Sequence, residues 1–284
     1  MKTKLNFKFF SLSFVWLWLI LFALIPYLMI FLASLMHHNQ QQLLSLPLTV
    51  NNYIALFNSA YLIIFEKSFY LAGSCTILCL LLGYPFAYII AHSNPKIKNF
   101  LLLLVVIPFW TSSLIRSYAM IAMLKTKGLL NSLLLSAGII HVPLQLLFTN
   151  AAVIIGLVYN LLPFMILPLY ANIERLDNRL IDAAKDLGAS KWRIFSKIII
   201  PLSMPGIMAG SIIVFLPAMT LFYIPNLLGG AKSMLLGNLI QDQFLLANNW
   251  PMGAAISIIL TLIMVLMLWV YWRYSNESDR QDLL

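Results

Sequence analysis

The sequence predicts an all-α membrane protein, a polytopic bundle of six transmembrane helices, because of its composition and its long apolar runs. The chain has 284 residues, of which 62% are hydrophobic and only 10% are charged. A soluble domain usually has about a quarter charged residues and about half apolar ones. An aqueous fold would leave much apolar surface uncovered, whereas a bilayer solvates it. We expect residues 1–284 to form a single transmembrane domain, since no internal repeat is evident.

Six apolar stretches are long enough to cross the hydrocarbon core, which takes about 20 residues of helix. Only helices and closed barrels satisfy their backbone groups in lipid, and continuous runs without alternation favour helices. The first run is too long for the core of a signal peptide, so it is expected to be an uncleaved span. The expected spans lie near residues 14–36, 69–91, 100–122, 146–170, 201–223 and 252–272.

Lysine and arginine residues orient these spans. With the N-terminus inside, thirteen of the 18 basic residues fall in inner segments and five in outer ones. The positive-inside rule therefore predicts that both termini are cytoplasmic and that the protein is a multi-pass membrane protein of the inner-membrane type. The basic residues lie between spans and not along one face, so the net charge of +9 does not predict nucleic-acid binding.

Arg116 is the one basic residue that could lie within a span. On a straight helix it would be about 27 Å beyond Lys98, near the outer interface, at 1.5 Å per residue. There its side chain could reach into water. The alternative is a role in gating or substrate contact.

The two outer connections, residues 37–68 and 124–145, are long enough to include short interfacial helices. The first of them contains a polar run from Asn39 to Gln42. This run could contact a soluble partner, or it could be a plain solvated loop.

The most informative segment is the inner loop at about residues 172–200. Apolar residues recur at helical spacing and line one face: Leu176, Leu180, Ala183 or Ala184, and Leu187. Local capping signals bound two short helices: Asp177 can cap the first, Gly188 can end it in a left-handed conformation, and Ser190 can cap the second. Pro201 then suits the first turn of the next span. The segment is expected to form a helix–turn–helix elbow, which could dock into a soluble partner and transmit its movement.

These residues resemble the EAA loop of ATP-binding-cassette importer permeases of type I. That pattern is Glu-Ala-Ala, three residues, Gly, nine residues, Ile, one residue and Leu-Pro. The spacing agrees throughout, with Asp182 in place of Glu and Ile200 in place of Leu. A lipid-surface amphipathic helix is the alternative, but it gives no reason for this spacing. The resemblance implies that the ATPase-coupling residues are Asp182, Ala183, Ala184, Gly188, Ile198 and Pro201.

Further segments resemble the permeases of spermidine/putrescine importers: 108–118, 156–165, 216–225 and 249–255. This resemblance implies a second permease subunit, two ATPase subunits, a periplasmic substrate-binding protein and a polyamine substrate. It also implies that ATP binds to the partner ATPase and that this chain carries no cofactor. A permease for another small solute is an alternative.

A polycation needs aromatic faces and oxygen acceptors along its path. Trp110, Met219, Phe222 and Tyr223 are the candidate path residues, with helix packing or an interfacial aromatic belt as the equal alternative. Carboxylates are scarce, because only Glu66 and Asp242 lie outside the inner loops. Most charge recognition would then belong to the binding protein and the second permease.

No catalytic or metal-binding motif is evident, so the chain is expected to be a transporter subunit and not an enzyme. Cys75 and Cys79 are four residues apart in an apolar run and are expected to be packing residues. A self-sufficient secondary transporter or channel would need ionisable residues inside its spans, and these spans have almost none. A membrane-embedded enzyme would need clustered polar residues at one depth.

Overall fold

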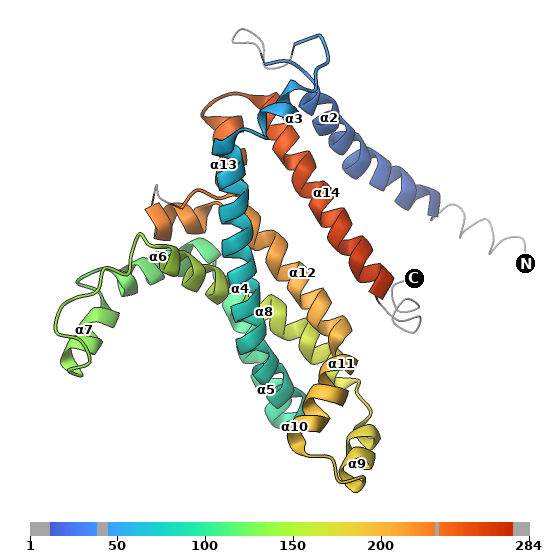
Figure 1. The fold of residues 1–284 in the computed structure, drawn as a ribbon, viewed down its shortest axis with the longest axis vertical. Coiled ribbons are helices and arrows are strands. Elements are labelled where there is room, and N and C mark those ends of the chain that lie inside the picture. Colours follow the sequence, from blue (N-terminus) through green and yellow to red (C-terminus); the bar gives the residue numbers. More distant parts are fainter. Residues whose placement is uncertain (1–11, 39–44, 231–232, 275–284) are drawn as a thin grey trace, which may run out of the picture. The chain divides into compact units, whose positions relative to one another are not determined.

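The computed structural model describes residues 12–38, 45–230 and 233–274, and within these ranges the regular elements are all helices (Figure 1). The polar run from Asn39 to Gln42 lies outside the described residues. Four described helices are long and apolar enough to cross a membrane, and two bent helix pairs bring the number to as many as six. The predicted all-α membrane fold is confirmed.

The chain divides into two compact units. The first unit contains residues 1–62 and 239–263, and the second contains residues 63–238 and 264–284. Two long helices cross the boundary: α4 (Ser59–His92) and α14 (Trp250–Tyr274).

In the first unit, the N-terminal helical run Leu12–Ser34 includes η1 (Ile20–Leu24) and α2 (Ile25–Ser34). Its most apolar stretch is 0% buried within the chain, so lipid or another subunit must cover it in a membrane. A short helix, α3 (Asn51–Ala55), follows. Asn52 Nδ2 donates to the carbonyls of Ser34 and Met36, both at 2.8 Å, and this ties α3 to the end of α2.

The start of α14 is capped locally. Asn249 Oδ1 accepts a hydrogen bond from the Met252 backbone at 3.2 Å, which satisfies a first-turn N–H group. Phe244, in α13 (Leu236–Leu245), meets Trp250 edge to face with ring centroids 5.7 Å apart.

The second unit begins with most of α4, which continues to His92 and is followed by α5 (Pro95–Val106) and η2 (Ile107–Trp110). The helix α6 (Ser113–Leu124) and the short α7 (Leu129–Ser136) come next. The predicted short helices in the outer connections are therefore present as α3 and α7. Because α4 starts at Ser59, it is longer at its N-terminal end than the expected span near 69–91.

The expected straight span near residues 100–122 is wrong. Pro95–Trp110 and Ser113–Ser136 meet at 92°. Pro108 supplies no backbone N–H, and Thr111 has extended angles (φ −100°, ψ 143°), so the helical hydrogen bonds stop there. The straight-helix estimate of the position of Arg116 fails with it.

The centre of the second unit is the pair formed by α8 (Asn150–Glu174) and α12 (Met204–Thr220), which lie side by side (Figure 1). Two glycines of α12 allow this close approach. A Cβ atom on Gly206 would lie 3.1 Å from the Pro168 backbone oxygen, and one on Gly210 would lie 2.7 Å from Met165 Sδ. Small residues four apart are a common means of close helix packing in membranes.

A second bend, of 63°, separates Lys191–Leu202 from Met204–Thr220. Pro201 lies before this bend, in α11 (Ile200–Leu202), whereas Pro205 occupies the first turn of α12. The expectation that Pro201 begins the next span is therefore wrong. The actual break is at Ser203, whose hydroxyl donates back to the Ile200 carbonyl at 3.1 Å.

Candidate functional site

The elbow, residues 177–201, begins with α9 (Asn178–Asp186), whose ends are built by local hydrogen bonds. Asp177 Oδ1 accepts from the Arg179 backbone N–H at 2.9 Å, as predicted for a cap. Gly188 has φ +76°, and its N–H donates to the Lys185 carbonyl at 2.9 Å, while the Ala189 N–H donates to the Ala184 carbonyl at 3.0 Å. This pair of bonds is a Schellman ending, so the predicted left-handed glycine is confirmed.

The second part of the elbow consists of α10 (Lys191–Ile194), η3 (Phe195–Ile199) and α11 in direct succession. Ser190 Oγ accepts from the Arg193 backbone N–H at 3.4 Å, which confirms the predicted second cap. Ile194 and Ile199 are buried, so this part is anchored by its apolar face.

Side chains from α4 hold the elbow. The Tyr84 hydroxyl shares a 2.9 Å hydrogen bond with Ser203 Oγ, at the bend before α12. The Tyr84 ring also meets Phe195 edge to face, with centroids 5.7 Å apart. The elbow is therefore in direct contact with α4, and α4 is also bonded to the residue before α12.

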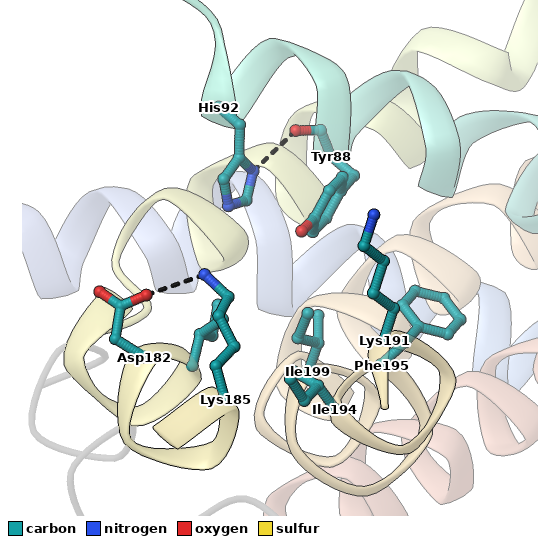
Figure 2. A pocket seen from close by; sticks show the side chains of 9 residues that line it. Tyr88, His92, Asp182, Lys185, Lys191, Ile194, Phe195 and Ile199 are labelled. Carbon is teal, nitrogen blue, oxygen red and sulfur yellow. Dashed lines mark hydrogen bonds and ion pairs between the residues drawn. The ribbon is translucent and has the colours of Figure 1, made fainter. Parts of the chain in front are cut away.

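A cavity of about 550 Å³ lies between the elbow and the end of α4 (Figure 2). Asp182 and Lys185 form a 2.8 Å ion pair on one side of it, and His92 Nδ1 donates to the Tyr88 carbonyl at 2.9 Å on the other. The Asp182 carboxylate raises the pKa of the Lys185 ammonium above its ordinary value, chiefly through this hydrogen bond. In Figure 2 the side chains of Lys185 and Lys191 point toward the end of α4.

Three large apolar side chains of the elbow are exposed. Leu187 is 89% exposed and Trp192 is 75% exposed, and Leu180 is also exposed. Exposed apolar side chains that lie close together on a surface are typical of a protein contact. Among the predicted coupling residues, Asp182, Ala183, Gly188 and Pro201 are exposed, Ile198 is half-buried and Ala184 is buried.

An ion pair fixes the position where α8 meets the elbow. Lys98 Nζ, in the first turns of α5, lies 2.8 Å from Glu174 Oε1 at the end of α8. The two side chains are 19% and 40% exposed, so solvent screens part of their attraction.

A second cavity of the same unit, the Arg116 cavity, has a volume of about 470 Å³. Residues of α6, α8 and α12 and the segments next to them line it. The lining residues are Phe109, Thr111, Ser112, Ser113, Arg116, Asn160, Leu161, Phe164, Pro217, Leu221 and Tyr223. The 92° bend brings Arg116 beside α8, where its guanidinium carbon lies 5.7 Å from the centre of the Tyr159 ring.

The structure separates the four candidate path residues. Tyr223 lines the Arg116 cavity. The Phe222 ring meets the Tyr223 ring edge to face, with ring centroids 6.1 Å apart. Trp110 is 79% exposed and is not among the lining residues. Met219 is 0% exposed, so in this conformation it belongs to the packed interior.

Asn160 and the aromatic pair Phe109 and Phe164 were not predicted as functional residues. The two rings meet edge to face at 4.9 Å between centroids, on the wall of the Arg116 cavity. Asn160 is the one amide residue in the otherwise apolar central part of α8, residues 151–169, and that contrast is the sequence signal that could have identified it.

A multi-pass helical fold with a short helical elbow between two spans is typical of a transport permease subunit. The model of one family, described as the binding-protein-dependent transport system inner membrane component, matches residues 83–274. The chain belongs to this family.

Two curated relatives support this family assignment. The chain is 49% identical over 271 residues to the spermidine/putrescine transport system permease protein PotB of Haemophilus influenzae, with 95% of each chain covered. It is 51% identical over 264 residues to the protein of the same name from Escherichia coli K12, covering 93% of this chain and 96% of the other.

Solved structures support the fold alone. A chain of a bacterial ABC transporter that imports the acidic polysaccharide alginate superposes with a TM-score of 0.69 at 18% identity. The match covers 97% of this chain and 100% of that one. The family and the curated relatives show that the protein is a multi-pass permease component of an ABC importer in the inner membrane, and the family implies a partner ATPase and a periplasmic binding protein.

Proposed function

We propose that this chain forms one half of the translocation path of an ATP-driven polyamine importer, with spermidine and putrescine as substrates. The observation that carries this proposal is identity of about half over 93–95% of the chain to permeases named for those substrates. A fold likeness at 18% identity could not support a substrate, since related folds carry different solutes.

The elbow would couple the chain to the ATPase. Leu187 and Trp192 would enter a groove of the ATPase, because burying such exposed apolar side chains favours association. When two ATPase subunits close on ATP, each elbow would move as a rigid body. The contacts of Tyr84 with Ser203 and Phe195 would then pass this movement to α4 and α12.

The path itself would include the Arg116 cavity. Phe109, Phe164 and Tyr223 offer ring faces, and Asn160 offers an amide oxygen, which suit an ammonium group. We place the elbow and both termini in the cytoplasm, on the basis of the lysine and arginine distribution.

The complete importer would contain a second permease, two ATPase subunits and a periplasmic binding protein. The second permease would supply the other wall of the path. This chain would bind no ATP and no other cofactor, and ATP hydrolysis would take place on the partner.

Uptake by the complete importer in proteoliposomes tests the proposal, with radiolabelled spermidine outside, binding protein present and ATP enclosed. The wild-type importer should accumulate spermidine only with ATP. Leu187→Asp should lose both uptake and retention of the ATPase, because it places a charge in the proposed contact. Ile139→Asp is the matched control, since Ile139 is 69% exposed in the connection after α7. It should retain the ATPase.

The outcomes separate the parts of the proposal. Absence of spermidine uptake, with ATPase retention still dependent on Leu187, would show that another small solute is the substrate. Full ATPase retention by Leu187→Asp would contradict the coupling role of the elbow.

A further inference from the structure

The Arg116 cavity contains buried hydrogen-bond donors that nothing in the described part of the chain accepts. Nε and Nη1 of Arg116 are both buried and lack a hydrogen-bond partner. The guanidinium is positively charged at any physiological pH, and a buried unpaired donor of this kind is costly. Its contact with the Tyr159 ring, at 5.7 Å, offsets the charge only in part.

A buried acceptor lies in the same cavity. Asn160 is 4% exposed, and its Nδ2 donates to the Gly156 carbonyl at 2.9 Å. That bond fixes the orientation of the amide, because the reverse orientation would place two acceptors against each other. Asn160 Oδ1 is left buried without a partner among the described residues.

The charges around the cavity are one-sided. None of its lining residues is acidic, and the lining includes the hydroxyl residues Thr111, Ser112 and Ser113 at the start of α6. Ser112 makes no side-chain cap bond, so the first N–H groups of α6 add partial positive charge beside Arg116. The cavity is therefore electropositive, with donors that require an acceptor bearing negative charge.

We propose that the Arg116 cavity is a binding site for a monovalent anion, either a carboxylate from a neighbouring subunit or a free halide. The anion accepts hydrogen bonds from Arg116 and neutralises it. With Arg116 neutralised in this way, Asn160 Oδ1 and the aromatic rings can contact an ammonium group of the polyamine without repulsion from the guanidinium. This last consequence rests on the proposed polyamine path, whereas the anion site itself does not.

Two measurements on the assembled importer in lipid nanodiscs test the site. The first is the thermal unfolding midpoint at constant ionic strength, with chloride replacing isethionate. The second is retention of the second permease during purification. The variants are Arg116→Gln, which removes the charge, and Arg116→Lys, which keeps it. Lys127→Gln is the control, since Lys127 is exposed in the connection between α6 and α7.

A free halide predicts that chloride raises the wild-type midpoint in a saturable manner, that Arg116→Gln abolishes this response and that Lys127→Gln keeps it. A subunit carboxylate predicts no chloride response in the wild type. In that case Arg116→Gln reduces retention of the second permease roughly tenfold or more, the size expected for a lost charged hydrogen bond, and Arg116→Lys restores it.

Arg116→Gln that matches the wild type in both measurements overturns the proposal. If this variant fails to assemble, Asn160→Asp provides the second test, because it places a carboxylate inside the cavity. Where the wild type responds to chloride, this variant should assemble and lose the response, and an unchanged response would contradict the site. Where the wild type does not respond, the new carboxylate should displace that of the neighbouring subunit and lower retention of the second permease, and equal retention would contradict the site. Neither measurement depends on uptake, so failure of the polyamine assignment would leave their outcome intact.

Discussion

The elbow lies between α8 and α12 in the chain, and residues of the same two helices line part of the Arg116 cavity. The two regions differ in how their polar groups are paired. In the elbow, the side chains of Asp177, Asp182 and Ser190 all have partners within three residues. In the cavity, Arg116 and Asn160 keep buried polar atoms without a partner in the described residues. These polar side chains of the elbow are paired locally, whereas we propose that the cavity takes a group from outside the chain.

This difference agrees with the roles proposed for the two regions. A part that transmits movement must keep its shape without help, and local caps give it that shape. A part that receives a ligand must hold unpaired groups ready, at a cost in stability. The packed pair of α8 and α12 links the two regions as one body.

The largest effect on transport is expected where the shape of the elbow depends on one residue. Gly188→Val places a β-branched side chain at φ +76°, at a cost of about 1–2 kcal/mol, or a factor of 5–30 in the population of the formed turn. Uptake and polyamine-stimulated ATPase activity should fall accordingly. Gly188→Asn is the control, because asparagine tolerates this conformation. Equal loss in both variants would contradict the turn as the cause.

The next prediction concerns the packing of α8 against α12, which links the elbow to the Arg116 cavity. Gly206→Ala brings a Cβ to 2.7 Å from Asn172 Cβ and 3.1 Å from the Pro168 oxygen, so α8 and α12 must separate. We expect a loss of about 1–3 kcal/mol, seen as a lower thermal unfolding midpoint in detergent. Gly73→Ala is the control, since no atom lies within 4 Å of its added Cβ. Equal midpoints for the two variants would count against close packing at Gly206.

A smaller effect is expected from the ion pair beside the elbow. Lys98→Gln removes one partner of Glu174, which also bonds Tyr170, and should cost less than about 1 kcal/mol, because both side chains of the ion pair are partly exposed. The difference from wild type should shrink in 1 M salt, where screening acts within about 3 Å. Lys96→Gln changes an exposed neighbouring lysine and should have no effect. A salt-independent loss would indicate a packing role for Lys98.

The smallest effect is expected from the exposed pair within the elbow. Asp182→Asn should leave the unfolding midpoint unchanged and lower the pKa of Lys185 toward 10.5, its ordinary value. Because the folded pKa is raised, the pair favours the fold below that ordinary value and loses its effect as pH rises through the folded one. Titration of Lys185 by NMR after selective labelling measures the shift. An unchanged pKa would exclude Asp182 as its cause.

The sequence predicted the elbow well because its signals are local. Asp177, Gly188 and Ser190 act on backbone groups within five residues, so spacing alone specifies them. The error at Pro201 arose because two prolines, Pro201 and Pro205, both suit a first turn. Which of them begins the span depends on the break at Ser203, which the hydrogen bond from Tyr84 stabilises from another helix.

The Arg116 cavity could not be predicted in the same way. Its two unpaired residues, Arg116 and Asn160, belong to different helices, and only the 92° bend after Trp110 brings them to one cavity. The assumption of a straight helix placed Arg116 near the membrane surface. There water could solvate its guanidinium, so no hydrogen-bond partner was expected. The sequence also could not separate the candidate path residues of one short segment. Only the structure shows that Met219 is buried and that Tyr223 lines the cavity.

Site-specific crosslinking tests the coupling claim most directly. Leu187→Cys carries a thiol-reactive photocrosslinker in the assembled importer, and Ile139→Cys serves as the control. Cys75 and Cys79 are both 0% exposed, so they should not react in the folded chain. The account predicts an adduct between the ATPase and position 187, with none from position 139. No ATPase adduct from position 187, or equal adducts from both, would contradict the elbow as the contact between the permease and the ATPase.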